Sequence, residues 1–286
     1  MSRFLSQLLL ISIFLWQVVC IKTPISKELL KTFRRYIEIS TAAYIEPCPH
    51  PPQGIKIVHQ IYNRYTSTQG FIAIDEAANE VIIAFKGSEG FRDTVTDIRF
   101  FHVPLETVGV TDCNGCQVHK GFLRSWNSVA NDTVEMVKGL VESHPGMKIT
   151  ITGHSLGGAL ASLATASFRS LGFAVKTYTY GQPRTGDQKY ADFIDGLTRN
   201  TMFRVTHGND FVPRVPYQFL GYHHHSTEYW QSVDEPIAAK TFKCVGQDPE
   251  DCNLSTSASA FGPNAAHSFY IGLNLTAARV DGSNIC

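Results

Sequence analysis

The spacing of apolar residues along the chain predicts strands and helices in alternation. Five short runs rich in β-branched or aromatic residues end in glycine or polar turn residues: 70–74, 81–85, 148–152, 175–180 and 201–206. Helical spacing of apolar residues runs from Ser26 to Ala43, and a long helical segment ends at His144, before a Pro-Gly pair. This alternation is typical of an α/β fold with a central, mostly parallel sheet flanked by helices.

One strand–helix junction carries candidate chemistry. The run at 148–152 leads into the letters GHSLG at 153–157, and a helix-forming stretch of small residues follows at 159–164. This context predicts a nucleophile elbow, with Ser155 on a tight turn above a strand end. Glycines two residues before and after the serine leave room where a Cβ would clash. The N–H of Leu156 then faces a developing oxyanion at the helix N-terminus. A Gly/Ser-rich turn without chemistry is the alternative.

A second glycine-flanked turn follows the strand at 81–85, with the letters KGSEG at 86–90. In an enzyme with a nucleophile elbow, the loop after this strand supplies the other oxyanion donor. We expect Ser88 to donate its backbone N–H there, with its hydroxyl as a further donor. The alternative is a plain β-turn.

The segment 90–101 changes from strand to helix spacing. Phe91, Val95 and Ile98 fall on one helical face, and mostly charged or polar residues occupy the rest. Because this short helix follows the expected oxyanion loop, it is placed to act as a lid that covers the site in water and opens against lipid. An ordinary surface helix packed on the core is the alternative reading.

A serine nucleophile needs an imidazole as base and a carboxylate that orients it. The chain order in this type of site is serine, acid, histidine. Asp210 follows the strand at 201–206 across a Gly-Asn turn, and His267 lies in a loop near the C-terminus. The histidines at 223–225 are consecutive, so they point in different directions and make a poor metal site. We expect Ser155, Asp210 and His267 to form the triad, with no metal and no cofactor.

The N-terminal residues 1–20 have the profile of a signal peptide, with one arginine before a short apolar core and a small-residue site near Cys20. An uncleaved anchor is the alternative. We expect a secreted, extracellular chain with a single domain over 21–286 that acts as a monomer. Its 25 basic and 25 acidic residues balance, so nothing in the charge indicates a nucleic acid partner.

The cysteine count agrees with an oxidising compartment, because six cysteines remain beyond the leader. Proximity in sequence favours pairing Cys113 with Cys116 and Cys244 with Cys252, which leaves Cys48 for Cys286. A C-x-x-C redox or zinc half-site at 113–116 is the alternative, but no second such pair accompanies it. Three N-glycosylation sequons are present, at Asn131, Asn253 and Asn274. Of these, Asn253 lies in a polar loop and is the most favourable.

Taken together, the chain resembles the class 3, or filamentous-fungal, lipase family, which also contains feruloyl esterases. The likeness covers nearly the whole mature chain and rests on the motifs AFKGSEG, VHKGF, ITGHSLGGALA, YGQPRTG, VTHGNDFVPRVP, GYHHHSTEYW and HSFY. It implies an α/β-hydrolase fold, the triad and oxyanion donors given above, a lid at 90–101 and the same three disulfides. Two positions depart from the family pattern: Lys86 stands where arginine is usual, and Thr94 where lipase members commonly have tryptophan.

The resemblance implies a secreted serine ester hydrolase, and the apolar face of the lid favours an acylglycerol lipase that works through an acyl-enzyme. Its partners are then an ester substrate and, transiently, a lipid–water interface. A feruloyl or other soluble carboxylic ester hydrolase is the alternative within the same class. A secreted binding protein that has kept a hydrolase fold is the remote alternative.

Overall fold

The computed structural model describes residues 22–88, 101–257, 264–281 and 285–286. Within these ranges the central sheet has nine strands in the order β1-β13-β12-β10-β8-β7-β4-β3-β2. Their bounds are β1 Thr23–Pro24, β2 Lys56–Asn63, β3 Thr68–Asp75, β4 Glu80–Phe85, β7 Lys148–His154, β8 Val175–Tyr180, β10 Met202–His207, β12 Glu228–Gln231 and β13 Thr241–Cys244. The expectation of a mostly parallel central sheet is confirmed.

The middle of the sheet is parallel and its margins are antiparallel. Strands β4, β7, β8, β10 and β12 run in one direction, whereas β2 and β3 on one side and β13 and β1 on the other pair antiparallel. The carboxyl ends of the five parallel strands therefore meet at one edge, where ligand-handling residues of such sheets gather.

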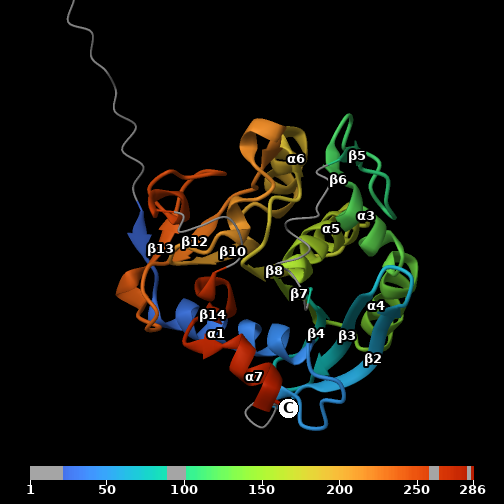
Figure 1. The fold of residues 1–286 in the computed structure, drawn as a ribbon. Helices are drawn as coiled ribbons and strands as arrows, with labels where there is room; N and C mark the ends of the chain where they lie inside the picture. Colours follow the sequence, from blue (N-terminus) through green and yellow to red (C-terminus); the bar gives the residue numbers. More distant parts are fainter. Residues whose placement is uncertain (1–21, 89–100, 258–263, 282–284) are drawn as a thin grey trace, which may run out of the picture.

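Helices cover both faces of the sheet, as Figure 1 shows. On one face lie α1 (Lys27–Ala42) and α7 (Leu275–Asp281), and on the other α3 (Lys120–Asn127), α4 (Ala130–Ser143) and α5 (Leu156–Ser170), with α6 (Gln188–Thr198) packed on α5. The start of α1 is fixed by Ser26, whose hydroxyl oxygen accepts a hydrogen bond from the N–H of Leu29 at 3.1 Å.

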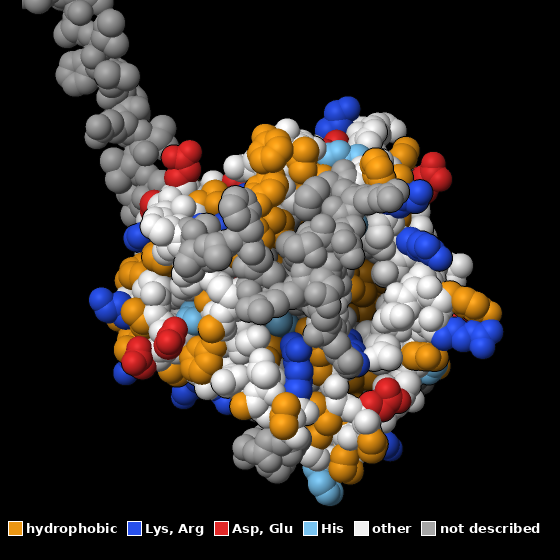
Figure 2. Space-filling model, viewed as in Figure 1, with side chains coloured by type: hydrophobic (Ala, Val, Ile, Leu, Met, Phe, Trp, Pro, Cys, Tyr) orange, Lys and Arg blue, Asp and Glu red, His pale blue; other side chains and the backbone are white. Residues whose placement is uncertain are grey.

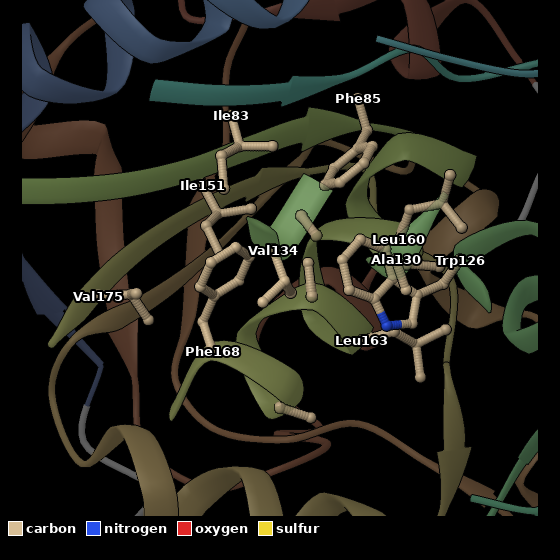
Figure 3. Close-up of a cluster of buried hydrophobic side chains, with 14 of the residues drawn as sticks. Ile83, Phe85, Trp126, Ala130, Val134, Ile151, Leu160, Leu163, Phe168 and Val175 are labelled. Carbon is tan, nitrogen blue, oxygen red and sulfur yellow. The ribbon is translucent and has the colours of Figure 1, made fainter. Parts of the chain in front are cut away.

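Alternation along the strands divides the apolar core into two layers. In β4, Val81, Ile83 and Phe85 pack with α3, α4 and α5, whereas Ile82 and Ala84 pack beneath α1. Figure 3 shows the first layer, where Phe85 meets the indole of Trp126 edge to face. All these side chains are fully buried. Each large one stabilises the fold by roughly 1.5–3 kcal/mol relative to the exposed state.

Smaller elements complete the described chain. Four short strands form a second, antiparallel sheet: β5 His102–Pro104, β6 Gln117–His119, β9 Gly186–Asp187 and β11 Tyr222–His223. A hairpin near the C-terminus joins β14 (Phe269–Tyr270) to β15 (Leu273–Asn274). The 3₁₀ turns are η1 Pro52–Gly54, η2 Val212–Arg214, η3 Gln218–Leu220, η4 Ala238–Lys240, η5 Asn253–Ser255 and η6 Ala265–Ser268.

Among the described residues there are three disulfides, Cys48–Cys286, Cys113–Cys116 and Cys244–Cys252. The last two are the pairs that sequence proximity favours, and the first is the pair that this leaves, so all three expected pairings are confirmed. The first ties the loop after α1 to the C-terminal residue across 238 positions. Closing so long a loop restricts the unfolded chain and contributes about 5 kcal/mol in the chain-entropy view.

Two sequence expectations differ from the structure. The helical segment that ends at His144 is two helices, because the chain breaks at Ser128 and Val129 between α3 and α4. Of the nine central strands, β1, β2, β12 and β13 have no counterpart among the predicted elements. Residues 1–20 and the lid positions Phe91, Val95 and Ile98 lie outside the described residues. In the part of the chain that is described, no helix is long and apolar enough to cross a membrane.

Candidate active site

Ser155 lies on a strained turn between β7 and α5. Its backbone has φ 61° and ψ −128°, a conformation that residues other than glycine rarely adopt. The turn is tight enough that a Cβ on Gly153 would overlap the carbonyl of Gly157, and one on Gly157 would overlap the carbonyl of Phe85. The glycines two residues before and after the serine are therefore required by close backbone approach, and the serine side chain projects from the carboxyl edge of the sheet.

The structure brings Ser155, His267 and Asp210 together from three separate segments. Nε2 of His267 lies 2.9 Å from Oγ of Ser155, and Nδ1 of His267 lies 3.0 Å from Oδ2 of Asp210. All three side chains are buried. A hydrogen bond from Nδ1–H to the carboxylate leaves Nε2 as the acceptor, so the imidazole is oriented to take the serine proton.

The Asp210 carboxylate is held by neutral donors. The N–H of Val212 donates to Oδ1 at 2.9 Å, and the hydroxyl of Tyr270 donates to Oδ2. Burial and the Asp210 charge raise the pKa of Tyr270 well above its ordinary value, so this hydroxyl keeps its proton. The sequence reasoning missed Tyr270, although it stands three residues after His267.

A second histidine supports the backbone of the first. Nε2 of His154 lies 2.8 Å from the carbonyl oxygen of His267, and its Nδ1 lies 2.8 Å from the hydroxyl of Tyr44. Burial, together with the neighbouring His267, holds the pKa of His154 well below its usual range. The ring is therefore neutral, donates through Nε2 and accepts from Tyr44. His154 also went unnoticed in the sequence, because its role depends on a partner more than a hundred residues away.

Both expected oxyanion residues border a cavity of about 610 Å³ beside the elbow. Ser88 and Leu156 line it together with His119, Phe122 and Leu160. Leu156 is the first residue of α5, where backbone N–H groups have no partner within the helix. Lys86 enters the same wall and donates from Nζ to Oε1 of Gln69 at 2.7 Å.

Known proteins are similar to this chain in sequence and in fold. The sequence profile described as "Lipase (class 3)" matches residues 82–220. Secreted mono- and diacylglycerol lipase 1 of Fusarium solani is 34% identical over 246 residues, which cover 79% of this chain and 72% of that protein. The chain belongs to the class 3 lipases.

Solved lipase structures superpose on most of the chain. A triacylglycerol lipase from Penicillium expansum gives a TM-score of 0.80 at 25% identity, covering 90% of this chain and 98% of that one. A lipase from Rhizopus microsporus var. chinensis gives a TM-score of 0.77 at 27% identity, covering 88% of this chain and 90% of that one. The expected α/β-hydrolase fold is confirmed, and the lipase is a carboxylic ester hydrolase.

The structure argues against glycosylation at one of the three sequons of the lipase. Asn253 was the most favourable by sequence, yet its side chain is buried and its amide nitrogen donates to the carbonyls of Gly208 and Asp210. A glycan on that nitrogen would displace both hydrogen bonds. Asn131, in the first turn of α4, and Asn274 in β15 are exposed and stay predicted glycosylation sites.

The consecutive histidines of the lipase belong to a polar network. His224 and His225 are buried, with Nε2 of His224 bonded to the carbonyl of Pro213 at 2.7 Å. Among the described residues, no group of three His, Cys, Asp or Glu side chains could hold a metal ion.

Figure 2 shows side chains of both charge signs scattered around the rim of the face seen in Figure 1.

Proposed function

We propose that this class 3 lipase is a secreted acylglycerol hydrolase that forms an acyl-enzyme on Ser155. The observation that carries the proposal is the unbroken chain from Ser155 Oγ to His267 and on to Asp210, with contacts of 2.9 and 3.0 Å. Nε2 of His267 takes the hydroxyl proton as Oγ attacks the ester carbonyl, and Asp210 stabilises the imidazolium that forms. The imidazolium then protonates the leaving glycerol oxygen, and a water molecule repeats the sequence on the acyl-enzyme.

The tetrahedral intermediate needs donors for its oxyanion. The backbone N–H of Leu156, at the positive end of α5, and that of Ser88, after β4, are our candidates. Both border the cavity beside the serine, which supports the assignment. Loss of one such donor costs about 3 kcal/mol of transition-state stabilisation.

The substrate class is argued from the cavity and the relatives. Part of the wall of the 610 Å³ cavity is apolar, formed by Phe122, Leu156 and Leu160, and this suits an acyl chain. Thr66, Thr68 and Ser125 add hydroxyl groups to the same wall. Relatives named as mono- and diacylglycerol lipases support acylglycerols as the substrates. The segment 90–101 is our proposed lid, and a lipid–water interface is the surface to which it responds.

We further propose that residues 1–20 leave as a signal peptide and that 21–286 act as one monomeric domain. The three disulfides support secretion, because such bonds persist in oxidising compartments. The names of the Fusarium and Penicillium relatives, which include the word "secreted", support it as well.

The test is the initial rate on di- and triacylglycerols of medium chain length, measured through their solubility limits. We expect the wild-type rate to jump when droplets appear, and Ser155→Ala to lower kcat by at least about 10⁴-fold. Ser143→Ala is the matched control, because Ser143 is exposed on α4 and bonds only within that region.

The outcomes separate the alternatives. A wild-type rate that saturates below the solubility limit and gains nothing beyond it would replace the lipase assignment with a soluble-ester hydrolase. Preference for feruloyl esters over acyl esters would name that hydrolase. Full activity in Ser155→Ala would reject the nucleophile itself.

A further inference from the structure

The turn that carries Asp210 is held from outside by one buried amide. Asp210 follows β10 across Gly208 and Asn209, and its own N–H donates to the carbonyl of His207 at 2.8 Å. Nδ2 of Asn253 donates to the carbonyl oxygens of Gly208 and Asp210, at 3.2 and 3.0 Å. One side chain thus bridges two carbonyls of the turn, and both its N–H donors are used there.

The orientation of this amide is fixed by a group that can only donate. Nε of Arg214 lies 3.2 Å from Oδ1 of Asn253, and Nη2 of the same arginine donates to the Asn253 carbonyl at 2.5 Å. Because a guanidinium has no acceptor, the atom that faces it must be the amide oxygen. The amide nitrogen therefore faces the turn, and Asn253 is 2% exposed.

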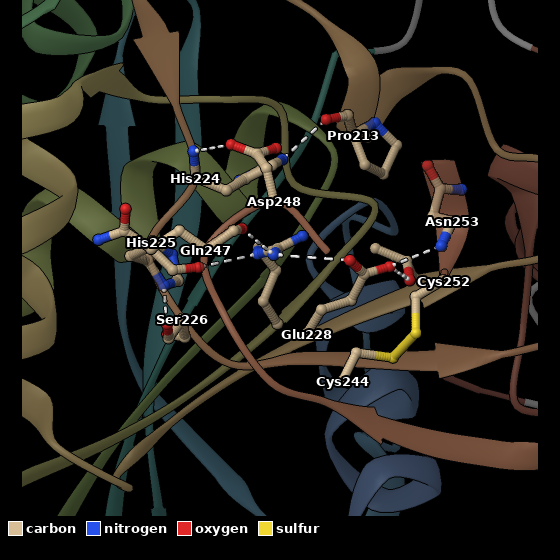
Figure 4. A network of polar contacts seen from close by, with 12 residues as sticks. Pro213, His224, His225, Ser226, Glu228, Cys244, Gln247, Asp248, Cys252 and Asn253 are labelled. Carbon is tan, nitrogen blue, oxygen red and sulfur yellow. Dashed lines mark hydrogen bonds and ion pairs between the residues drawn. A yellow bond between two sulfur atoms is a disulfide. The ribbon is translucent and has the colours of Figure 1, made fainter. Parts of the chain in front are cut away.

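The backbone of Asn253 is anchored to the sheet. Its N–H donates to Oε1 of Glu228 in β12 at 3.1 Å, and the same carboxylate oxygen accepts from the hydroxyl of Thr206 in β10 at 2.6 Å. The preceding residue, Cys252, is joined by the disulfide to Cys244 in β13. Figure 4 shows Asn253 beside Glu228 and this disulfide. Two adjacent strands therefore fix the residue that holds the Asp210 turn.

We propose that Asn253 is a positioning residue of the triad, clamped by the Cys244–Cys252 disulfide, which sets the distance and direction of the Asp210 carboxylate toward His267. This rests on the proposed role of Asp210. Asn253 acts through the turn, because its amide nitrogen donates to the carbonyls of Gly208 and Asp210. A sequon position is thereby used for a buried hydrogen-bond bridge instead of a glycan.

The first test is Asn253→Asp, which keeps the shape and an oxygen for Arg214 but places a carboxylate oxygen against two carbonyls. We expect kcat on soluble p-nitrophenyl butyrate to fall about tenfold with KM within twofold, since small misplacements of a catalytic group cost up to about a hundredfold. We also expect the low-field proton resonance of the His267–Asp210 hydrogen bond to move upfield. A purely structural role would lower the melting temperature and leave both readouts of the folded protein unchanged, which would overturn the proposal.

Ser255→Ala is the matched control, because it removes the sequon and one local hydrogen bond, from the Ser255 hydroxyl to the Cys252 carbonyl, and leaves the Asn253 amide in place. Ser255 is exposed, and we expect wild-type kcat. A loss in Ser255→Ala equal to that in Asn253→Asp would assign the effect to a glycan and reject the bridge. If Asn253→Asp gives no folded protein, Arg214→Lys removes the donor to Oδ1 and should lower kcat in the same direction; an unchanged kcat and resonance would then reject the proposal.

Asp210→Ala separates this inference from the proposed function. A large loss in Asp210→Ala with none in Asn253→Asp rejects the positioning role alone. No loss in Asp210→Ala rejects the triad on which it rests.

Discussion

The two edges of the central sheet each hold a buried carboxylate, and the two carboxylates differ in their partners. At the amino edge, Glu80 at the start of β4 accepts from the hydroxyl of Tyr36 at 2.7 Å and from that of Thr150, and its other oxygen lies 3.3 Å from Arg35. At the carboxyl edge, Asp210 accepts from Val212, Tyr270 and His267. Among the described residues, its ion-pair partner is the titratable His267.

The difference separates stability from chemistry. Arg35 carries a permanent charge and also pairs with Asp75 at 2.5 Å, so the amino-edge carboxylates share a fixed cation whether or not a reaction takes place. The backbone N–H of Val212 and the hydroxyl of Tyr270 that donate to Asp210 carry no charge that would offset the carboxylate. Its field is therefore left to stabilise the imidazolium that forms only during catalysis. A buried carboxylate thus indicates a functional site when its hydrogen-bond donors are neutral groups and its ion-pair partner is a histidine.

The largest expected effect comes from the same change at both edges. Asp210→Asn should lower kcat by roughly 10³–10⁴-fold, because an amide favours the wrong imidazole tautomer and cannot stabilise the imidazolium. Glu80→Gln should leave kcat within twofold but lower the free energy of unfolding by about 2 kcal/mol, because Arg35 loses one of its two carboxylates. Steady-state kinetics and urea unfolding of both variants measure the two effects. Comparable losses of kcat in both would remove the distinction between the edges.

A smaller effect is expected from the two tyrosine hydroxyls that donate to these carboxylates. Tyr270→Phe should lower kcat about tenfold, because Asp210 loses a charge-assisted hydrogen bond that fixes it toward His267. Tyr36→Phe removes the equivalent donor from Glu80 and should cost about 1.5 kcal/mol of stability with no change in kcat. Burial, with Glu80 beside it, raises the pKa of Tyr36 to about 12, so both hydroxyls are protonated in these assays. Equal kcat values for the two variants would show that Tyr270 has only a structural role.

The sequence predicts the site best where the signal is local. The elbow joins strand, glycine turn and helix within a few residues, and Asp210 directly follows a parallel strand, so both could be placed from pattern alone. The sequence did not predict the roles of His154, Tyr270 and Asn253, because their hydrogen-bond partners lie 43 to 113 residues away. No periodicity encodes such contacts.

The same limit applies to the elements of the fold. Strand β2 lies at the edge of the sheet, and its register shifts between Ile57 and His59, which interrupts the two-residue alternation. The break between α3 and α4 depends on Ser128. Its hydroxyl donates to the carbonyl of Ser125, and the hydroxyl oxygens of Ser128 and Thr66 lie 2.7 Å apart. A local polar bond and a distant one together end α3 where apolar spacing continues.

The smallest expected effect is on the pH dependence of stability, which should differ between the active-site side of the sheet and its amino edge. His119 caps α3 near the site, accepting at Nδ1 from the N–H groups of Gly121 and Phe122, and burial together with nearby His102 lowers its pKa to about 4. The unfolded imidazole titrates near 6.5, so between these values the unfolded chain binds more protons and stability falls as pH falls.

From pH 6.5 to 5.5, His119 should account for a loss of about 1 kcal/mol, and His119→Asn, which keeps an oxygen acceptor for the cap, should abolish that part of the slope. At the amino edge, burial opposes but the Ala78 N–H and Arg35 prevail and lower the pKa of Asp75, so its contribution holds above about pH 4 and is lost only as pH falls further. Urea unfolding at pH 5.5 and 6.5 measures the difference, with exposed His50→Asn as control. An unchanged slope in His119→Asn would show that the cap histidine is protonated in the fold, and the pH sensitivity would then belong to other buried histidines.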